Sequence, residues 1–338
     1  MAVKISVIIV AHDRRIFLPY AVESVLHQSL QRDSYEILVV KHFTDNEFDK
    51  YLTGQGIKVI ITDEESLGSK LVLGINHSNG DIVSFLEDDD VFLENKLENV
   101  INNFSDHFLV YYHNNFSVIN DQGSVLGVSM PYFQKSRGNK KLRINTNEIK
   151  LNTIIKLDRE GGFFNLSCIS VRRSLVTGIL DSFRGINVAM DNFLFYLALD
   201  SGQRSLIDSE VFTQYRIHDL NSSLSAIADK DKFIANKLDF FRRDLVGFRA
   251  IHSLSKNDVV EKYLSCRTLI PEIWISLLSY KKADVIEIFN ALLCSIRIRS
   301  VNLFVSAVMY ASTRFFSNLA LLFFYNYEMY KVNKINKS

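Results

Sequence analysis

The sequence predicts an α/β fold with a mostly parallel sheet, followed by a C-terminal helical region. Within the first hundred residues, apolar β-branched runs alternate with segments whose apolar residues recur at helical spacing, as in right-handed βαβ units. From Asp229 onward the pattern is almost entirely helical. With 47% hydrophobic residues, 14 Gly and 3 Pro among 338 residues, the composition indicates packed domains rather than a disordered chain,.

The first strand is predicted at Ile5 to Val10 (ISVIIV), a continuous apolar run that suits burial on both faces of a parallel sheet,. A helix from Phe17 to Leu30 follows, with Pro19 in its first turn, where the missing N–H costs least. The alternation then predicts strands and helices in turn at Tyr35 to Val40, Asn46 to Thr53, Ile57 to Thr62, Gly68 to Asn76 and Asp81 to Leu86. Ligands bind beyond the carboxyl ends of such strands, so the polar residues that follow each strand are the candidates for chemistry.

Past Asn99 the alternation of strands and helices becomes less regular. The Gly/Asn/Lys-rich stretch Ser136 to Asn147 and the loop Asp158 to Asn165 are expected to cover the strand ends and to bind a second substrate,.

The net charge of +1 excludes a general nucleic-acid binder, because such proteins need a strong basic excess,. The charge is nevertheless uneven. Residues 1–220 carry 22 basic and 28 acidic side chains, whereas residues 221–338 carry 17 basic and 10 acidic ones. The two parts of the chain are therefore expected to meet different partners.

The cysteines and the N-terminus bear on the compartment. Cys168, Cys266 and Cys294 are odd in number and far apart, so we expect buried thiols in a reducing environment rather than a disulfide framework,. The first ten residues predict a strand rather than a signal peptide. We therefore expect a cytoplasmic protein, at the inner face of the cell membrane if it binds one.

The acidic run Glu87-Asp88-Asp89-Asp90 directly follows the fourth predicted strand. Adjacent carboxylates repel one another and raise each other's pKa unless a cation lies among them, and hard divalent ions take such oxygen ligands. Mg²⁺ in particular binds through one or two carboxylates plus substrate phosphates. A solvated acidic turn is the alternative, but acidic residues at the end of an apolar strand favour a nucleoside diphosphate site.

Two further residues are candidates. Asp191 lies at the head of an apolar helical segment, where it is either an N-terminal cap or a general base,. His218, in YRIHDLNSS, is either a structural hydrogen-bonding residue or a neutral imidazole that completes a carboxylate-bound metal site,.

The order of these motifs is more specific than any one of them. SVIIVAHDR, GDIVSFLEDDDVFLENKL, MDNFLFYLAL and YRIHDLNSSLS together resemble the inverting nucleotide-sugar glycosyltransferases of family 2, which have the GT-A fold. The resemblance spans about residues 4–225. It implies a GT-A domain over residues 1–225, with a nucleotide-binding half (1–100) and an acceptor half (101–225), before a helical region over 226–338.

The resemblance also implies roles for individual residues. Asp191 falls on the family's catalytic base, although Met190 replaces the usual preceding Glu. The implied metal ligands of Mg²⁺ or Mn²⁺ are Asp89, Asp90 and His218. The implied nucleotide-sugar contacts are Val10, Ala11, His12, Asp13, Lys41, Lys70, Asp88 and Asp89.

Two departures from the family pattern leave the donor base open. Val10-Ala11-His12-Asp13 replaces the usual P-T-Y-N, and Lys41-His42-Phe43-Thr44 replaces D-D-G-S, which reverses the expected local charge. We expect transfer to a glycan or lipid-linked acceptor by a single displacement. The alternatives are a nucleotidyltransferase, which needs no separate base, and a catalytically impaired nucleotide-sugar-binding or scaffold protein.

The C-terminal third contains two apolar stretches, Val301 to Thr313 and Phe315 to Tyr327, on either side of Arg314. Each is shorter than the roughly 20 residues of a spanning helix, and a joined helix would place Arg314 near the bilayer centre. We therefore expect peripheral membrane contact through residues 288–338. Packing as a helical core or a dimer interface is the alternative.

Overall fold

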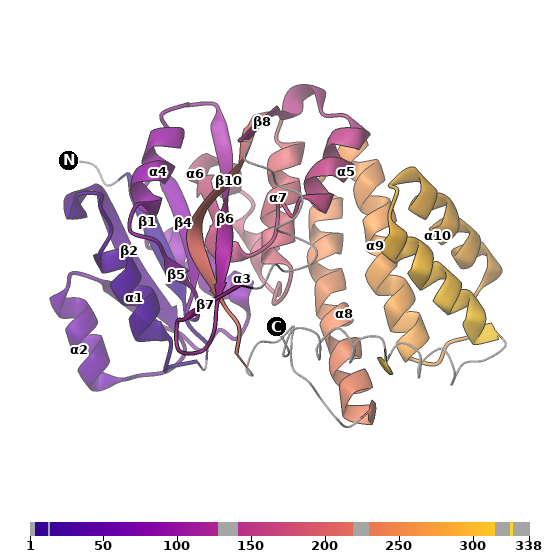
Figure 1. Cartoon of the computed structure of the whole chain (residues 1–338), viewed down its shortest axis with the longest axis horizontal. Coiled ribbons are helices and arrows are strands. Elements are labelled where there is room, and N and C mark those ends of the chain that lie inside the picture. Colours follow the sequence, from indigo (N-terminus) through magenta and orange to yellow (C-terminus); the bar gives the residue numbers. More distant parts are fainter. Residues whose placement is uncertain (1–3, 13, 128–140, 219–229, 315–324, 327–338) are drawn as a thin grey trace. The chain divides into compact units, whose positions relative to one another are not determined.

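The structure is a computed structural model that describes residues 4–12, 14–127, 141–218, 230–314 and 325–326 (Figure 1). The chain forms two compact units. The first comprises Met1–Ile149 and Leu157–His218, and the second comprises Lys150–Lys156 and Asp219–Ser338. The predicted boundary at residue 225 lies outside the described residues, so the domain limits stay a prediction.

Four parallel strands form one half of the sheet in the first unit. They run in the order β3 (Lys58–Ile61), β2 (Tyr35–Lys41), β1 (Ile5–Val10) and β4 (Ile82–Glu87). Every residue of β1 is buried. All four strands were predicted, because a β-branched run buried on both faces is a strong signal.

The other half of the sheet is mixed. The order continues from β4 through β9 (Ile169–Arg172), β6 (Leu109–Ile119) and β10 (Arg204–Arg216) to β5 (Val91–Phe92). β9 is antiparallel to both of its neighbours, whereas β10 is parallel to β6. Two short strands, β7 (Val125–Leu126) and β8 (Leu142–Asn145), pair with β6 and β10. The prediction of an α/β sheet followed by helices is confirmed. The strand order and the antiparallel pairing in this half were not predicted from the sequence.

The helices of the first unit follow from local sequence. α1 (Leu18–Leu26) begins with Pro19 near its start, and the side chains of Asp45 and Ser66 cap α2 (Asn46–Gly54) and α3 (Leu67–Asn76),. The helices α4 (Lys96–Asn103), α6 (Arg173–Val176) and α7 (Met190–Asp200) follow later in the chain. α5 (Leu151–Arg159) spans residues of both units. A core cluster lies between α1 and the sheet and includes Ile5, Val7, Leu18, Val22 and Val39.

Gly68 lets α3 approach a neighbouring 3₁₀ turn, η4 (Leu180–Phe183). A Cβ on Gly68 would lie 1.8 Å from the carbonyl oxygen of Phe183, and the Gly68 N–H donates to the Ile186 carbonyl at 2.8 Å. Only glycine fits such a close backbone approach. The contact fixes the segment that leads into α7 beside the start of α3.

The second unit is helical, as predicted. It contains α8 (Lys230–Leu254), α9 (Asp258–Leu278) and α10 (Val285–Arg297), and residues 301–314 are also helical. Side chains of Asn257 and Asp284 cap α9 and α10. None of the described helices is both long and apolar enough to cross a membrane. Most of the apolar stretch 315–327 lies outside the described residues.

The cysteine prediction was partly wrong. Cys266 in α9 and Cys294 in α10 form a disulfide with their Cα atoms 5.3 Å apart, whereas Cys168 is buried and takes no part in a disulfide. Sequence separation hid this pairing, because two adjacent antiparallel helices bring residues 28 positions apart to the same level.

Candidate active site

The acidic run lies at the carboxyl end of β4 and is buried. Asp88 and Asp90 have no exposed surface, and Asp89 is 4% exposed. The backbone N–H of His12, just beyond β1, donates to Asp88 Oδ2 at 2.8 Å. The ends of the adjacent parallel strands β1 and β4 thus place the predicted nucleotide loop and the predicted acidic motif against each other.

Arg14 is the principal cation among these carboxylates. Its guanidinium lies 2.6 Å from Asp88 Oδ1 and also forms an ion pair with Asp89. Burial disfavours the charged guanidinium, but Asp89, Asp88, Glu87 and Asp90 outweigh it and raise the pKa of Arg14 above its usual value. The sequence analysis gave this residue no role of its own, because its partners lie more than 70 residues away in the sequence.

The carboxylates hold protons more tightly than free acids do. Burial raises the pKa of Asp88 to about 6 and the pKa of Asp90 to about 7, with a further contribution to each from the charge of Asp89. Burial, together with the charges of Asp89 and Asp90, raises the pKa of Glu87 well above its ordinary value. A bound cation would lower these pKa values, so the electrostatics favour a positively charged ligand here.

Asp90 and Asp191 are joined through one residue, Asn165. The Asn165 side-chain amide donates to Asp90 Oδ2 at 2.8 Å, and its backbone N–H donates to Asp191 Oδ2 at 3.2 Å. Its own Oδ1 accepts the Ser167 N–H at 2.7 Å and so caps the 3₁₀ turn η3 (Leu166–Cys168). Asn165 has a φ of +72°, a conformation that Asn adopts more readily than most residues,. The sequence placed Asn165 at the end of a covering loop but gave it no role.

Asp191 lies inside the first turn of α7 rather than at its cap, because the N-cap position is Ala189. Its Oδ1 accepts the backbone N–H of Asn192 at 2.8 Å. Burial raises the pKa of Asp191 to about 6, although these hydrogen bonds to its carboxylate oppose the rise. A carboxylate with such a pKa can accept a proton near neutral pH.

Arg216 and Lys96 support the acidic turn from the other half of the sheet. The Arg216 backbone N–H donates to Asp90 Oδ1 at 3.0 Å, and its Nε donates to the Asp89 carbonyl at 2.8 Å. Lys96 is fully buried, and its Nζ donates to Asn114 Oδ1 at 2.8 Å and to the Ser167 carbonyl at 2.6 Å. Burial lowers the pKa of Lys96 to about 7. These contacts tie α4, β6, β10 and η3 to the turn.

The residues predicted to contact the nucleotide lie at two places, the end of β1 and the end of β2. Val10 and Ala11 are buried at the end of β1, and Lys70 Nζ, itself buried, lies 3.2 Å from His12 Nδ1. Asp13 lies outside the described residues. Lys41 is fully buried and forms an ion pair with Asp49. Asp49 in α2 thus offsets the charge of Lys41, and the role of Lys41 at the nucleotide stays a prediction.

The predicted metal ligands are only partly brought together. Asp89 Oδ2 and His218 Nε2 lie 3.1 Å apart, and two ligands about 2.1 Å from one octahedral ion also lie about 3 Å apart. Both oxygens of Asp90 instead accept the hydrogen bonds from Arg216 and Asn165. No group of three or more His, Cys, Asp or Glu side chains within the described ranges is arranged to hold a metal ion. Asp89 Oδ2 also pairs with the Arg14 guanidinium, so a divalent ion at Asp89 and His218 would have to displace Arg14, and the three-residue set stays a prediction.

The comparison with known families agrees with this geometry. The model of the family described as "Glycosyl transferase family 2" matches residues 6–173. The chain belongs to glycosyl transferase family 2. The matched segment begins in β1 and ends just after β9, so it contains the acidic turn, Arg14 and Asn165.

Relatives in curated collections are distant and match a limited segment. An uncharacterized glycosyltransferase of Rickettsia bellii is 27% identical over 127 residues, which cover 36% of this chain and 18% of that protein. A second, from Rickettsia felis, is 25% identical over 127 residues, which cover 36% of this chain and 21% of that protein. The matched segment therefore spans about a fifth of these relatives.

Two solved structures have a fold similar to that of this chain. S. aureus TarS residues 1–349 in complex with UDP has a TM-score of 0.57 at 13% identity, covering 98% of this chain and 91% of that chain. A mannosyltransferase from Pyrobaculum calidifontis, in complex with GDP-Man and Mn²⁺, has a TM-score of 0.53 at 11% identity, covering 95% of this chain and 86% of that chain. At these identities the likeness shows the GT-A fold alone.

Replacing Asn165 tests whether it positions the two carboxylates. Asn165→Gly keeps a backbone that tolerates positive φ but removes the amide that bridges to Asp90. We expect glycosyl transfer to slow about 10- to 100-fold, as for other residues that orient a functional group, with little change in the KM for donor. The measurement is kcat and KM alongside the melting temperature. Asn95→Gly, outside the site, is the control, and full activity in Asn165→Gly would refute the role.

Proposed function

We propose that this protein transfers a sugar from a nucleoside diphosphate sugar to a hydroxyl group of a glycan or lipid-linked acceptor, with inversion at the anomeric carbon. The bridge from the acidic turn through Asn165 to Asp191 is the observation that carries the proposal. It supports the proposal because Asp191, with its raised pKa, lies next to a buried cluster of carboxylates whose electrostatics favour a cation. Sugar transfer requires such an arrangement, because the leaving diphosphate of the donor and the attacking hydroxyl of the acceptor react at the same carbon atom.

Asp191 is proposed as the general base. Its raised pKa of about 6 leaves it ionised at neutral pH, yet basic enough to accept a proton from an attacking hydroxyl,. As the acceptor oxygen forms its bond to the anomeric carbon, the bond to the diphosphate oxygen breaks and the proton moves to Asp191. This single displacement needs no enzyme nucleophile and inverts the configuration.

Positive charge on the donor side would stabilise the departing diphosphate. Lys70 lies at the carboxyl end of β1 beside His12, and Arg14 lies at the acidic turn. A divalent ion, when held by Asp89 and His218, would offset further negative charge on the leaving group. The donor base stays open, since one structural neighbour was solved with UDP-GlcNAc and another with GDP-Man.

The two alternative functions differ in their products. A nucleotidyltransferase releases pyrophosphate, whereas the proposed reaction releases a nucleoside diphosphate. A catalytically impaired scaffold binds nucleotide sugars and releases neither. Incubation of the purified protein with UDP-, GDP- and dTDP-sugars, Mn²⁺ or Mg²⁺, and assay of both products separates the three.

Asp191→Asn tests the proposed base. The amide is isosteric but cannot accept the proton, so we expect kcat to fall about 100- to 10,000-fold. Donor binding by calorimetry should be unchanged, because the carboxylates of the acidic turn remain. Asp181→Asn, at a side chain that is 97% exposed, is the matched control. Turnover at the wild-type rate in Asp191→Asn would rule out this residue as the base.

We also propose that the second unit contacts an anionic membrane surface. α10 exposes a row of apolar side chains, and the following helical residues 301–314 expose more: Val285, Ile286, Phe289, Leu293, Ile296, Val301, Phe304, Val305 and Val308. The exposed cations Arg297 and Arg299 lie at the end of α10, and no acidic residue occurs from 288 to 327. An apolar face flanked by basic residues is typical of helices that lie at a lipid headgroup layer.

A flotation assay with vesicles of phosphatidylglycerol and phosphatidylcholine tests the membrane proposal. Wild-type protein should float with anionic vesicles and remain at the bottom with vesicles of phosphatidylcholine alone. The double substitution of Ile286→Ser and Phe289→Ser should abolish flotation, whereas Phe108→Ser, at a phenylalanine that is 66% exposed in the first unit, should not. Wild-type protein that stays at the bottom in both cases, or that forms dimers broken by the double substitution, contradicts it.

A further inference from the structure

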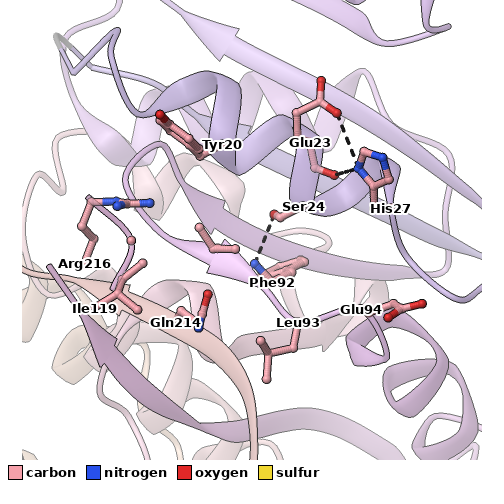
Figure 2. A pocket seen from close by; sticks show the side chains of 12 residues that line it. Tyr20, Glu23, Ser24, His27, Phe92, Leu93, Glu94, Ile119, Gln214 and Arg216 are labelled. Carbon is pink, nitrogen blue, oxygen red and sulfur yellow. Dashed lines mark hydrogen bonds and ion pairs between the residues drawn. The ribbon is translucent and has the colours of Figure 1, made fainter. Parts of the chain in front are cut away.

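A cavity of about 610 Å³ lies beside the acidic turn in the first unit. Figure 2 shows it between α1 and β5, with the end of β10 along one side. Its lining combines one exposed aromatic ring with several polar groups: Tyr20, Glu23, Ser24, His27, Val91, Phe92, Leu93, Glu94, Ile119, Gly123, Gln214 and Arg216. The proposed transfer reaction, as described so far, assigns no role to this cavity.

The cavity walls are held together by hydrogen bonds. The Phe92 N–H donates to Ser24 Oγ at 3.1 Å, as drawn in Figure 2. Next to it, Gln28 Nε2 donates to the Leu93 carbonyl at 2.9 Å, and the Ser29 N–H donates to the Glu94 carbonyl at 2.8 Å. These bonds fix α1 against β5 and the residues that follow. A ligand therefore meets a preformed surface, which lowers the entropic cost of binding.

Arg216 connects this cavity to the proposed catalytic site. Its guanidinium lies over the Tyr20 ring at 5.5 Å, on the cavity side. The same residue donates from its backbone to Asp90 and from Nε to the Asp89 carbonyl. Arg216 thus contacts the acidic turn and also lines the cavity. The predicted nucleotide residues His12 and Lys70 lie elsewhere, at the end of β1.

The charges of the lining disfavour an anionic ligand. Arg216 is only 2% exposed, and its Nη1 donates to the carbonyls of Asn120 and Asp121. The Arg216 guanidinium therefore already donates its hydrogen bonds to groups of the protein, and little of it is exposed to a ligand. Glu23 and Glu94 bring two carboxylates to the lining, which would repel a phosphate,.

The remaining chemistry suits a neutral sugar chain. Tyr20 is 59% exposed and offers a flat ring against which the C–H face of a sugar can stack,. Gln214, the two carboxylates and His27 supply donors and acceptors for hydroxyl groups,. The Tyr20 ring and the polar side chains around it therefore match a sugar ring, which has an apolar C–H face and hydroxyl groups at its edge.

We propose that this cavity binds the neutral sugar units of a glycan acceptor, at a distance from the hydroxyl group that is glycosylated. The inference rests on the proposed function, because it identifies part of the acceptor for the same reaction. It makes the acceptor an oligosaccharide rather than a single sugar or a free lipid. It also assigns Tyr20 as a binding residue for acceptor and gives it no part in donor chemistry.

Direct binding tests this without turnover. The full-length protein is titrated with a panel of neutral oligosaccharides of three or more units, namely maltotriose, cellotriose, chitotriose and mannotriose, with a hyaluronan tetrasaccharide as the anionic comparison. At least one neutral member should bind, and Tyr20→Ala should weaken that binding about tenfold. Tyr280→Ala, at a tyrosine that is 54% exposed in the second unit, is the matched control and should leave binding unchanged.

Donor binding, measured on the same proteins with UDP- and GDP-sugars, separates the two proposals. Tyr20→Ala should bind donor as the wild type does. If no nucleotide sugar binds but an oligosaccharide binds through Tyr20, the transfer function fails and the cavity assignment survives as a glycan site. If donor binds but no neutral oligosaccharide does, or if binding is insensitive to Tyr20→Ala or strongest for hyaluronan, the cavity assignment is overturned.

Discussion

The burial of acidic side chains at the carboxyl end of β4 is the constraint on which the rest of the first unit depends. An isolated carboxylate taken out of water costs several kcal/mol, at order of magnitude, unless protons, hydrogen bonds or cations compensate. The chain supplies all three here. Arg14 pairs with Asp88 and Asp89, and the pKa of Asp90 is raised to about 7. The backbone N–H of His12 also donates to Asp88, and that of Arg216 donates to Asp90.

This compensation explains features that otherwise look unrelated. The positive φ of Asn165 lets one residue donate to both Asp90 and Asp191. The buried amine of Lys96 holds η3, the turn that Asn165 caps, against β6 and β10. The mixed half of the sheet therefore supports the acidic turn, and the antiparallel strand β9 follows directly from η3. A site of this kind, positioned by several strands, suits chemistry that requires an accurate distance between base and leaving group.

The sequence predicts the parallel half of the fold well and the mixed half poorly, for a physical reason. Strands β1 to β4 are short apolar runs between helices, whereas β6 (LVYYHNNFSVI) contains His and Asn residues whose burial is satisfied only by tertiary partners such as Phe164 and Thr213. Asp88 to Asp90, Asp191 and His218 stand out because polar residues interrupt apolar patterns. Arg14 and Asn165 do not stand out, since their importance comes from contacts 75 residues away. The ion pair of Lys41 is likewise not visible in the local sequence, because its partner, Asp49, lies in the next helix.

The pH dependence of glycosyl transfer tests the central claim, that a half-buried and hydrogen-bonded Asp191 accepts the proton of the acceptor hydroxyl. Because the base must be ionised, kcat/KM should fall about tenfold per pH unit below a pKa of about 6 and level off above it,. Asp191→Glu should retain measurable activity and move this break, since a longer carboxylate has different burial and partners. A profile that is flat from pH 5 to 8, or one whose break is identical in Asp191→Glu, would contradict the account.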